Sequence, residues 1–128
     1  MAPVEEAKRA LREGEAVIVY PEGTITRNPD HMPMEGKTGV ARLTLASDVP
    51  VLPMAVWGSQ HVWQREGAGS MKFGRPIWVK AGAPMDFSQY EGQKDDPPTL
   101  RKITETVMDE LGRLVTDLRA RYPKRWSE

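Results

Sequence analysis

Residues 20–24 read Tyr-Pro-Glu-Gly-Thr and directly follow a short apolar run. The carboxylate of Glu22 and the hydroxyl of Thr24 could contact a polar ligand, and Gly23 would let that ligand approach the backbone closely. In open α/β sheets, ligands bind beyond the carboxyl ends of the strands, and this stretch follows a predicted strand. A surface turn with a solvated glutamate is the alternative interpretation.

Two basic side chains downstream could bind an anion beside this turn. Arg27 lies in the same predicted loop. Lys37 lies at the predicted start of the next helix, where unpaired backbone N–H groups also favour an anion. A carboxylate for hydroxyl groups and basic groups for a phosphate would together suit a polyol phosphate.

The elements that must position these residues alternate between helix and strand. We expect helices at 3–13 and 36–47, strands at 16–20 and 50–56, and one or two strands within 71–82. This order predicts the α/β class, with a mixed, largely parallel sheet flanked by helices. The strands at 16–20 and 50–56 are apolar enough to be buried on both faces.

The last predicted helix has the clearest pattern in the chain. Asp96 could cap its first turn, and Pro97 suits the first helical position. Apolar residues then recur at three- and four-residue spacing, which is typical of one buried helix face. These residues are Leu100, Ile103, Val107, Leu111, Leu114, Leu118 and Tyr122.

Composition limits the possible functions. The 128 residues suit one compact domain, and a net charge of zero offers no global field to attract nucleic acid. The absence of cysteine excludes disulfides, thiolate nucleophiles and zinc–thiolate sites. No apolar run approaches the ~20 residues needed to span a bilayer.

Three stretches resemble the glycerolipid acyltransferase family, which contains the glycerol-3-phosphate and 1-acylglycerol-3-phosphate O-acyltransferases. VIVYPEGT at 17–24 resembles the family's Phe-Pro-Glu-Gly-Thr block. The stretch at 34–58 resembles the following helix and a Val-Pro-Val/Ile-x-Pro strand, and KFGRPI at 72–77 resembles a Phe-Gly-x-Pro strand. The likeness covers roughly residues 5–85 and is closest to actinobacterial members.

The resemblance implies an activity: transfer of a fatty acyl chain to a hydroxyl of glycerol phosphate or of a lysophospholipid. The donor would be acyl-CoA or acyl-carrier protein, and no metal or other cofactor is expected. Glu22, Gly23 and Thr24 match the block that holds the acceptor. Many members have arginine directly after the threonine, whereas this chain has Ile25 there and Arg27 two positions later.

The remaining site residues follow from the same resemblance. Arg27 is the candidate for the phosphate contact, and Lys37 could assist it. Pro53 matches the proline of the later block, which is tied to the acyl-donor side and to packing. Trp57, close to that block, could line an acyl path, although packing in the core is the favoured interpretation.

The family's catalytic motif, a histidine and an aspartate with four residues between them, is absent from residues 1–128. In the family the histidine is the general base and the aspartate orients it. His61 with Glu66 imitates that spacing but follows a different strand, so we expect His61 and His31 to be surface histidines. The resemblance therefore implies a single domain over 1–128 that is the C-terminal portion of an acyltransferase domain and is inactive alone. A non-catalytic binding module with a glycerol-phosphate-type pocket is the alternative.

Partners and location follow from these expectations. Missing upstream elements would leave apolar surface on the strands at 16–20 and 50–56, so we expect self-association or an upstream partner polypeptide. The family implies a cytoplasmic location, with peripheral binding at the inner face of the cell membrane. The basic stretch at 119–126 could dock at an anionic membrane surface, or it is a solvated helix end.

Overall fold

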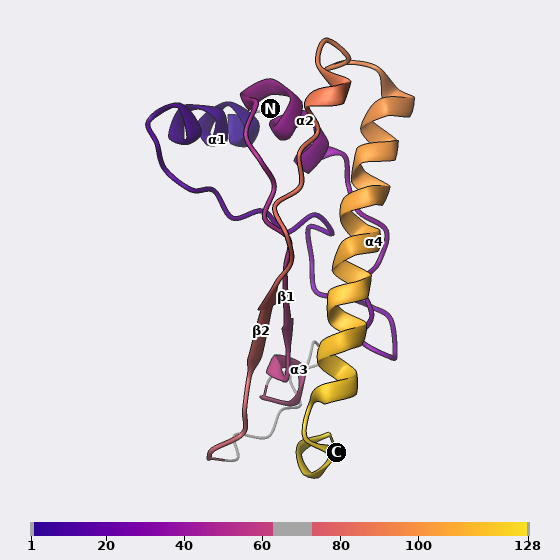
Figure 1. Ribbon diagram of the computed structural model, residues 1–128. Helices are drawn as coiled ribbons and strands as arrows, with labels where there is room; N and C mark the ends of the chain where they lie inside the picture. Colours follow the sequence, from indigo (N-terminus) through magenta and orange to yellow (C-terminus); the bar gives the residue numbers. More distant parts are fainter. Residues whose placement is uncertain (1, 63–72, 128) are drawn as a thin grey trace.

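The protein is described by a computed structural model over residues 2–62 and 73–127. Helix α4 runs along the pair of strands β1 and β2, while α1 and α2 lie together at one end of the molecule (Figure 1). The elements in chain order are α1 (Ala2–Arg12), α2 (Gly39–Ser47), β1 (Met54–Trp57), α3 (Ser59–Val62), β2 (Trp78–Ala81), the 3-10 helix η1 (Ser88–Tyr90), α4 (Pro97–Arg121) and the 3-10 helix η2 (Lys124–Trp126). The predicted α/β class is confirmed.

Helix α4 begins where the sequence predicts it. The Asp96 side chain accepts a hydrogen bond of 3.1 Å from the Thr99 backbone N–H, and Pro97 occupies the first helical position. This cap satisfies one of the helix's unpaired N–H groups. The predicted apolar face of α4 is buried, and its largest fully buried side chains are Leu100, Ile103 and Leu114.

The two strands form an antiparallel pair in which Val56 lies opposite Val79 and Trp57 lies opposite Trp78. Ala55 and Trp57 on one face of β1 pack against α4. The alternate residues face away from α4, and successive strand residues point to opposite faces of a sheet. Within residues 2–62 and 73–127, the pair is therefore covered on one face only.

The largely parallel sheet is not found among the described residues, where the strands are antiparallel. The strand at 50–56 is also shorter than predicted, because β1 begins only at Met54. Upstream of β1, Val51 forms an isolated bridge with Met85, and the buried Pro53 separates this bridge from the strand. Proline lacks the N–H that a continuous ladder would need, which accounts for the interruption at Pro53.

Residues 16–20 are the main departure from the predicted fold. They form no strand, and Ile18 and Tyr20 are 82% and 80% exposed. Within the described part of the chain, the backbone of residues 16–19 makes no hydrogen bond. The prediction of a buried strand here is wrong for this chain, because a strand requires a partner and none of the described segments supplies one.

The predicted N-terminal helix and the predicted helix before β1 are both confirmed. α1 turns a half-buried apolar face, which includes Val4 and Leu11, toward α2. α2 contributes Ala41 to a core cluster with Phe87 and Ile103. No helix within the described residues is both long and apolar enough to cross a membrane.

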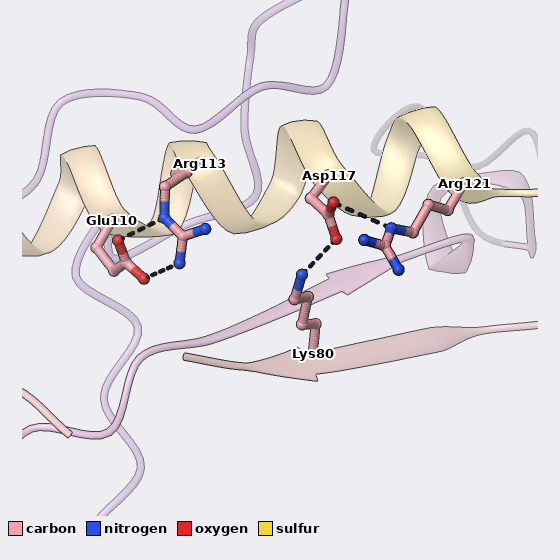
Figure 2. A network of polar contacts seen from close by, with 5 residues as sticks. All are labelled: Lys80, Glu110, Arg113, Asp117 and Arg121. Atoms are coloured by element: carbon pink, nitrogen blue, oxygen red, sulfur yellow. Dashed lines mark hydrogen bonds and ion pairs between the residues drawn. The ribbon is translucent and has the colours of Figure 1, made fainter. Parts of the chain in front are cut away.

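A polar network joins β2 to α4 (Figure 2). The Lys80 ammonium donates a hydrogen bond to the Asp117 carboxylate, which also accepts one of 3.0 Å from Arg121. One turn of helix away, Arg113 contacts Glu110 with two nitrogens, at 2.5 and 2.9 Å. The Lys80 hydrogen bond, with help from Arg121, holds the pKa of Asp117 below its usual value.

Candidate functional site

The Tyr-Pro-Glu-Gly-Thr stretch forms a tight turn at the surface. The Gly23 N–H donates a hydrogen bond of 3.0 Å to the Tyr20 carbonyl, and Gly23 has a φ of +72°. This left-handed backbone conformation is open to glycine at little cost and is strained for other residues. Glycine therefore suits this position of the turn.

Lys37 is brought against this turn although it lies fourteen positions after Gly23. Its backbone N–H donates a hydrogen bond of 2.8 Å to the Pro21 carbonyl. Its Nζ lies only 3.1 Å from the position that a Cβ on Gly23 would occupy. The absence of a side chain at residue 23 is thus what lets the ammonium group lie over the turn.

The Lys37 ammonium forms no ion pair with a described carboxylate. Helix α2 begins two residues later, and the side chain of its N-cap residue, Thr38, makes no capping hydrogen bond. Helix N-termini carry partial positive charge and unpaired N–H groups, which favour an anion. The turn, the ammonium and this helix end can together accept a negatively charged group.

Glu22 fastens the turn to the far end of the loop. Its carboxylate accepts a hydrogen bond of 2.8 Å from the Met34 backbone N–H, and the side chain is half-buried. A carboxylate has about four acceptor positions, so one hydrogen bond leaves others for hydroxyl groups of a ligand. The same side chain can therefore shape the loop and contact a polyol.

The loop between the turn and Lys37 is held by its own polar groups. The Thr26 hydroxyl and the Asn28 amide both donate to the Met32 carbonyl, at 2.7 and 3.0 Å. The Asp30 carboxylate accepts a hydrogen bond of 3.1 Å from the Met32 N–H. These contacts fix the loop that carries Met34 and Lys37 back to the turn.

Helix α4 anchors the end of this loop. Gly36 is buried, and a Cβ there would lie 2.7 Å from the Met108 side chain. Arg101 donates a hydrogen bond of 3.1 Å to the Gly36 carbonyl and forms an ion pair of 3.1 Å with Glu35. A rigid helix thus holds the residue directly before Lys37.

The side chains of two predicted site residues, Thr24 and Arg27, are not held beside Glu22 and Lys37 by contacts with described residues. The Thr24 side chain is exposed and makes no hydrogen bond with a described residue. The Arg27 backbone N–H lies 3.2 Å from the Met34 sulfur, and its side chain is exposed without an ion pair to a described residue. Both groups lie on the same loop as Glu22 and are available to a ligand.

Pro53 and Trp57 are packing residues in the structure. Pro53 is buried, and its carbonyl accepts a hydrogen bond of 2.9 Å from the Gly82 N–H. Trp57 is 6% exposed in the core cluster with Leu114 and Leu118. Of the two interpretations made from sequence, packing against the core is the one that these contacts support.

Comparison with known proteins gives the same family for the chain. Residues 1–57 match the Acyltransferase family model. The 1-acyl-sn-glycerol-3-phosphate acyltransferase of Limnanthes douglasii is 32% identical over 94 residues, which are 73% of this chain and 32% of the relative. The enzyme of the same name from Cocos nucifera is 26% identical over 90 residues, or 70% of this chain and 28% of the relative.

A solved structure supports the match in three dimensions. The 1-acyl-sn-glycerophosphate (LPA) acyltransferase PlsC from Thermotoga maritima is similar with a TM-score of 0.63 and 29% identity. The similarity covers 94% of this chain and 46% of the Thermotoga chain. The chain belongs to the glycerolipid acyltransferase family. It spans about a third of the curated relatives and under half of the solved acyltransferase.

Within the described residues, neither histidine of this chain contacts the Glu22 turn. His31 is exposed, as predicted, with a φ of +60°, and its ring lies 6.5 Å from the Trp57 ring. His61 is half-buried and stacks on Tyr122 with the ring centroids 5.7 Å apart, so the prediction of a surface histidine is wrong there. Glu66, which completes the imitation motif, lies outside the described residues.

The setting of His61 is that of a packed residue. Its carbonyl accepts a hydrogen bond of 3.0 Å from Arg75, and its Nε2 is buried without a partner among the described residues. Burial, with smaller effects from Arg75 and His31, lowers the pKa of His61 below its usual value. His61 is therefore a packed ring, stacked on Tyr122.

The sequence alone did not identify the residues that shape the loop between Glu22 and Lys37. Met34 supplies the backbone N–H for Glu22, and Asn28 and Thr26 close the loop. Asparagine and threonine often bond to nearby backbone groups in loops, so the stretch Thr-Arg-Asn-Pro-Asp did carry a signal. The partner of each side chain could not be read from that signal.

Proposed function

We propose that this chain is the acceptor-binding portion of a lysophosphatidate acyltransferase. One observation carries the proposal: the Lys37 ammonium lies over the Gly23 turn, on which Glu22 stands. The two relatives and the Thermotoga enzyme are each named as acyltransferases of 1-acylglycerol 3-phosphate. These names supply the substrate class of the proposal. The donor would be an acyl thioester, either acyl-CoA or acyl-carrier protein.

Each residue of the turn has a role in this proposal. Lys37 and the unpaired N–H groups at the start of α2 bind the phosphate, and Gly23 lets it approach the backbone. Glu22 and Thr24 contact the glycerol hydroxyls, while Arg27 reaches the phosphate from the loop. These contacts hold the reacting hydroxyl in position, which converts a bimolecular step into one with a fixed geometry.

Acyl transfer also needs a base to take the proton from the acceptor hydroxyl. As that oxygen bonds to the thioester carbonyl carbon, the thiolate leaves and takes up a proton. No residue of the Glu22 turn is a histidine, and residues 1–128 lack a histidine followed by an aspartate with four residues between them. We therefore propose that the base comes from polypeptide outside these residues.

The absence of this motif favours a second candidate for the chain alone, namely a binding module without turnover. Calorimetry with sn-glycerol 3-phosphate tests the pocket, which both candidates require. The Lys37→Ala chain should bind at least about tenfold more weakly, because a charge-assisted contact is lost. The exposed Lys102→Ala chain, altered on α4, is the matched control. Equal binding by both variants would refute the pocket.

Thiol release from acyl-CoA, with lysophosphatidic acid as the acceptor, separates the two candidates. The protein has no cysteine, so any new thiol comes from the donor. Binding without turnover is expected for the chain alone. Turnover that disappears in Glu22→Gln would show instead that residues 1–128 contain their own base. Peripheral membrane binding remains a further proposal, and co-sedimentation with anionic vesicles tests it.

A further inference from the structure

Lys37 directly follows a residue that is buried against helix α4. That residue, Gly36, lies so close to the helix that a Cβ there would be 2.7 Å from the Met108 Cγ and 3.0 Å from the Thr104 methyl carbon. Lys37 itself is exposed, and its backbone N–H donates a hydrogen bond to the Pro21 carbonyl. The exposed ammonium group can therefore keep its place over the turn only while the buried glycine stays on α4.

The Gly36 carbonyl has one hydrogen-bond donor among the described residues. That donor is Arg101 of α4, whose Nη1 lies 3.1 Å from the carbonyl oxygen, and no described backbone N–H donates to the same oxygen. A backbone carbonyl of a buried residue that loses its donor costs about as much free energy as a lost hydrogen bond. A hydrogen bond from a charged donor is also stronger than one between neutral groups. The Arg101 guanidinium is therefore the polar contact that holds the end of the loop on α4.

The same nitrogen of Arg101 forms an ion pair of 3.1 Å with Glu35. The Glu35 side chain is 83% exposed and the Arg101 side chain is 41% exposed. Exposed ion pairs contribute little, because water screens the charges and two long side chains must be ordered. The hydrogen bond to Gly36 is therefore the more important of the two contacts. Since one nitrogen makes both contacts, the single ammonium group of Arg101→Lys can replace it.

We propose that Arg101 is a positioning residue, which holds Lys37 in place for the phosphate of the acceptor without touching the ligand itself. The inference rests on the proposed acceptor site. When the guanidinium is removed, the Gly36 carbonyl loses its donor and the end of the loop loosens from α4. The hydrogen bond from Lys37 to Pro21 then weakens, and the ammonium group spends less time over the turn. A phosphate bound there loses affinity, although its own contacts are chemically unchanged.

Calorimetry with sn-glycerol 3-phosphate measures this loss of affinity. Arg101→Met removes the donor and keeps a long side chain, and it should bind about fivefold more weakly or worse. Arg101→Lys should recover most of the affinity, and Glu35→Gln should bind like the original chain because only an exposed ion pair is altered. Arg113→Met is the matched control, since it loses an ion pair of the same helix, with Glu110 in place of a loop residue.

Hydrogen exchange of the Lys37 amide gives a second readout that needs no ligand. Its hydrogen bond to Pro21 protects this N–H in the original chain. In Arg101→Met the Lys37 amide should exchange faster, while the amides in the middle of α4 exchange as before. Faster exchange at both places would indicate general destabilisation and would count against a positioning role.

The two readouts separate failure of Arg101 from failure of the acceptor site. An original chain that does not bind glycerol 3-phosphate refutes the site, and the Lys37 amide alone then decides whether Arg101 holds the loop. In a chain that binds, unchanged affinity and unchanged Lys37 exchange in Arg101→Met would overturn the proposal. Equal losses of affinity in Arg101→Met and Arg113→Met would also overturn it, because any lost charge on α4 would then have the same effect.

Discussion

The Glu22 carboxylate and the Met34 backbone N–H are joined by a hydrogen bond of 2.8 Å across twelve positions of the chain. This contact brings the end of the loop back to the turn where the loop begins. The Lys37 N–H donates a hydrogen bond to the Pro21 carbonyl of the same turn. Glu22 therefore has two tasks, one in the folded loop and one proposed for the ligand. Substitutions at this residue can separate them.

Glu22→Ala should destabilise the protein by about 1–2 kcal/mol, because a half-buried N–H loses its charged acceptor. Glu22→Gln should cost less, since its amide oxygen can accept the same hydrogen bond. Urea unfolding of the three chains measures both effects. Equal stability of the alanine and glutamine variants would mean that the bond to Met34 does not hold the loop.

Gly23→Ala should weaken both stability and ligand binding. A residue with a side chain at a φ of +72° costs about 1–2 kcal/mol, and the new Cβ would lie 3.1 Å from the Lys37 Nζ. Gly14→Ala is the matched control, because Gly14 has a φ of +85° with nothing within 4 Å of the added Cβ. Thermal unfolding and glycerol 3-phosphate calorimetry measure the two effects.

The two alanine variants should lose similar stability, and only Gly23→Ala should lose affinity for glycerol 3-phosphate. Unchanged affinity in Gly23→Ala would argue against the approach of a phosphate to this turn. A loss of affinity in both variants would point to a general effect of destabilisation.

Asp117 should make the protein less stable in acid. The Lys80 hydrogen bond lowers its pKa in the folded state, so the unfolded state binds the proton first as the pH falls. The Asp117 carboxylate makes its full contribution to stability above the unfolded-state pKa of about 3.9. This contribution is lost as the pH falls through the lower pKa of the folded state. Asp117→Asn should therefore lose less stability than the original chain between about pH 5 and pH 2.

Urea midpoints across this range measure the effect. Asp109→Asn is the matched control, because Asp109 is exposed on the same helix and forms no ion pair with a described residue. An acid response that is the same in Asp117→Asn and the original chain would show that the network in Figure 2 does not persist in solution.

His61 should give a separate loss of stability at mildly acidic pH. Its pKa is lowered in the folded state, chiefly by burial, so the unfolded chain is protonated first as the pH falls through about 6.5. Above that pH, the neutral His61 ring makes its full contribution to the free energy of unfolding. Below it, the contribution declines as the pH falls to the lower pKa of the folded state. His61→Phe keeps an aromatic ring against Tyr122 and should remove this decline, as urea unfolding between about pH 7.5 and pH 5 would show. A decline that persists in the variant would assign it to other groups.

The sequence was a good guide wherever one segment carries its own structure. The apolar spacing of α4, its Asp96 cap and its first-turn Pro97 are local signals, and all three are confirmed. The positive φ of Gly23 is local as well, since glycine is the residue for which it is least costly. The family itself was recognisable because its blocks are short and lie in a fixed order.

The sequence was a poor guide wherever a structure needs a partner. Residues 16–20 have the composition of a buried strand, yet they form none, because strand formation depends on backbone pairing with another segment. β1 reads as buried on both faces, but only the face of Ala55 and Trp57 meets α4. Composition does not record whether a covering element is present.

The sequence by itself determined the Tyr-Pro-Glu-Gly-Thr stretch, the long helix and the family. Only the tertiary structure decided that Lys37 lies over Gly23, that Met34 binds Glu22 and that Trp57 belongs to the core. The physical reason is the range of the forces involved. Helix caps and turns are fixed within a few residues, whereas a loop closed by α4 and a sheet face left bare depend on contacts between segments far apart in the chain.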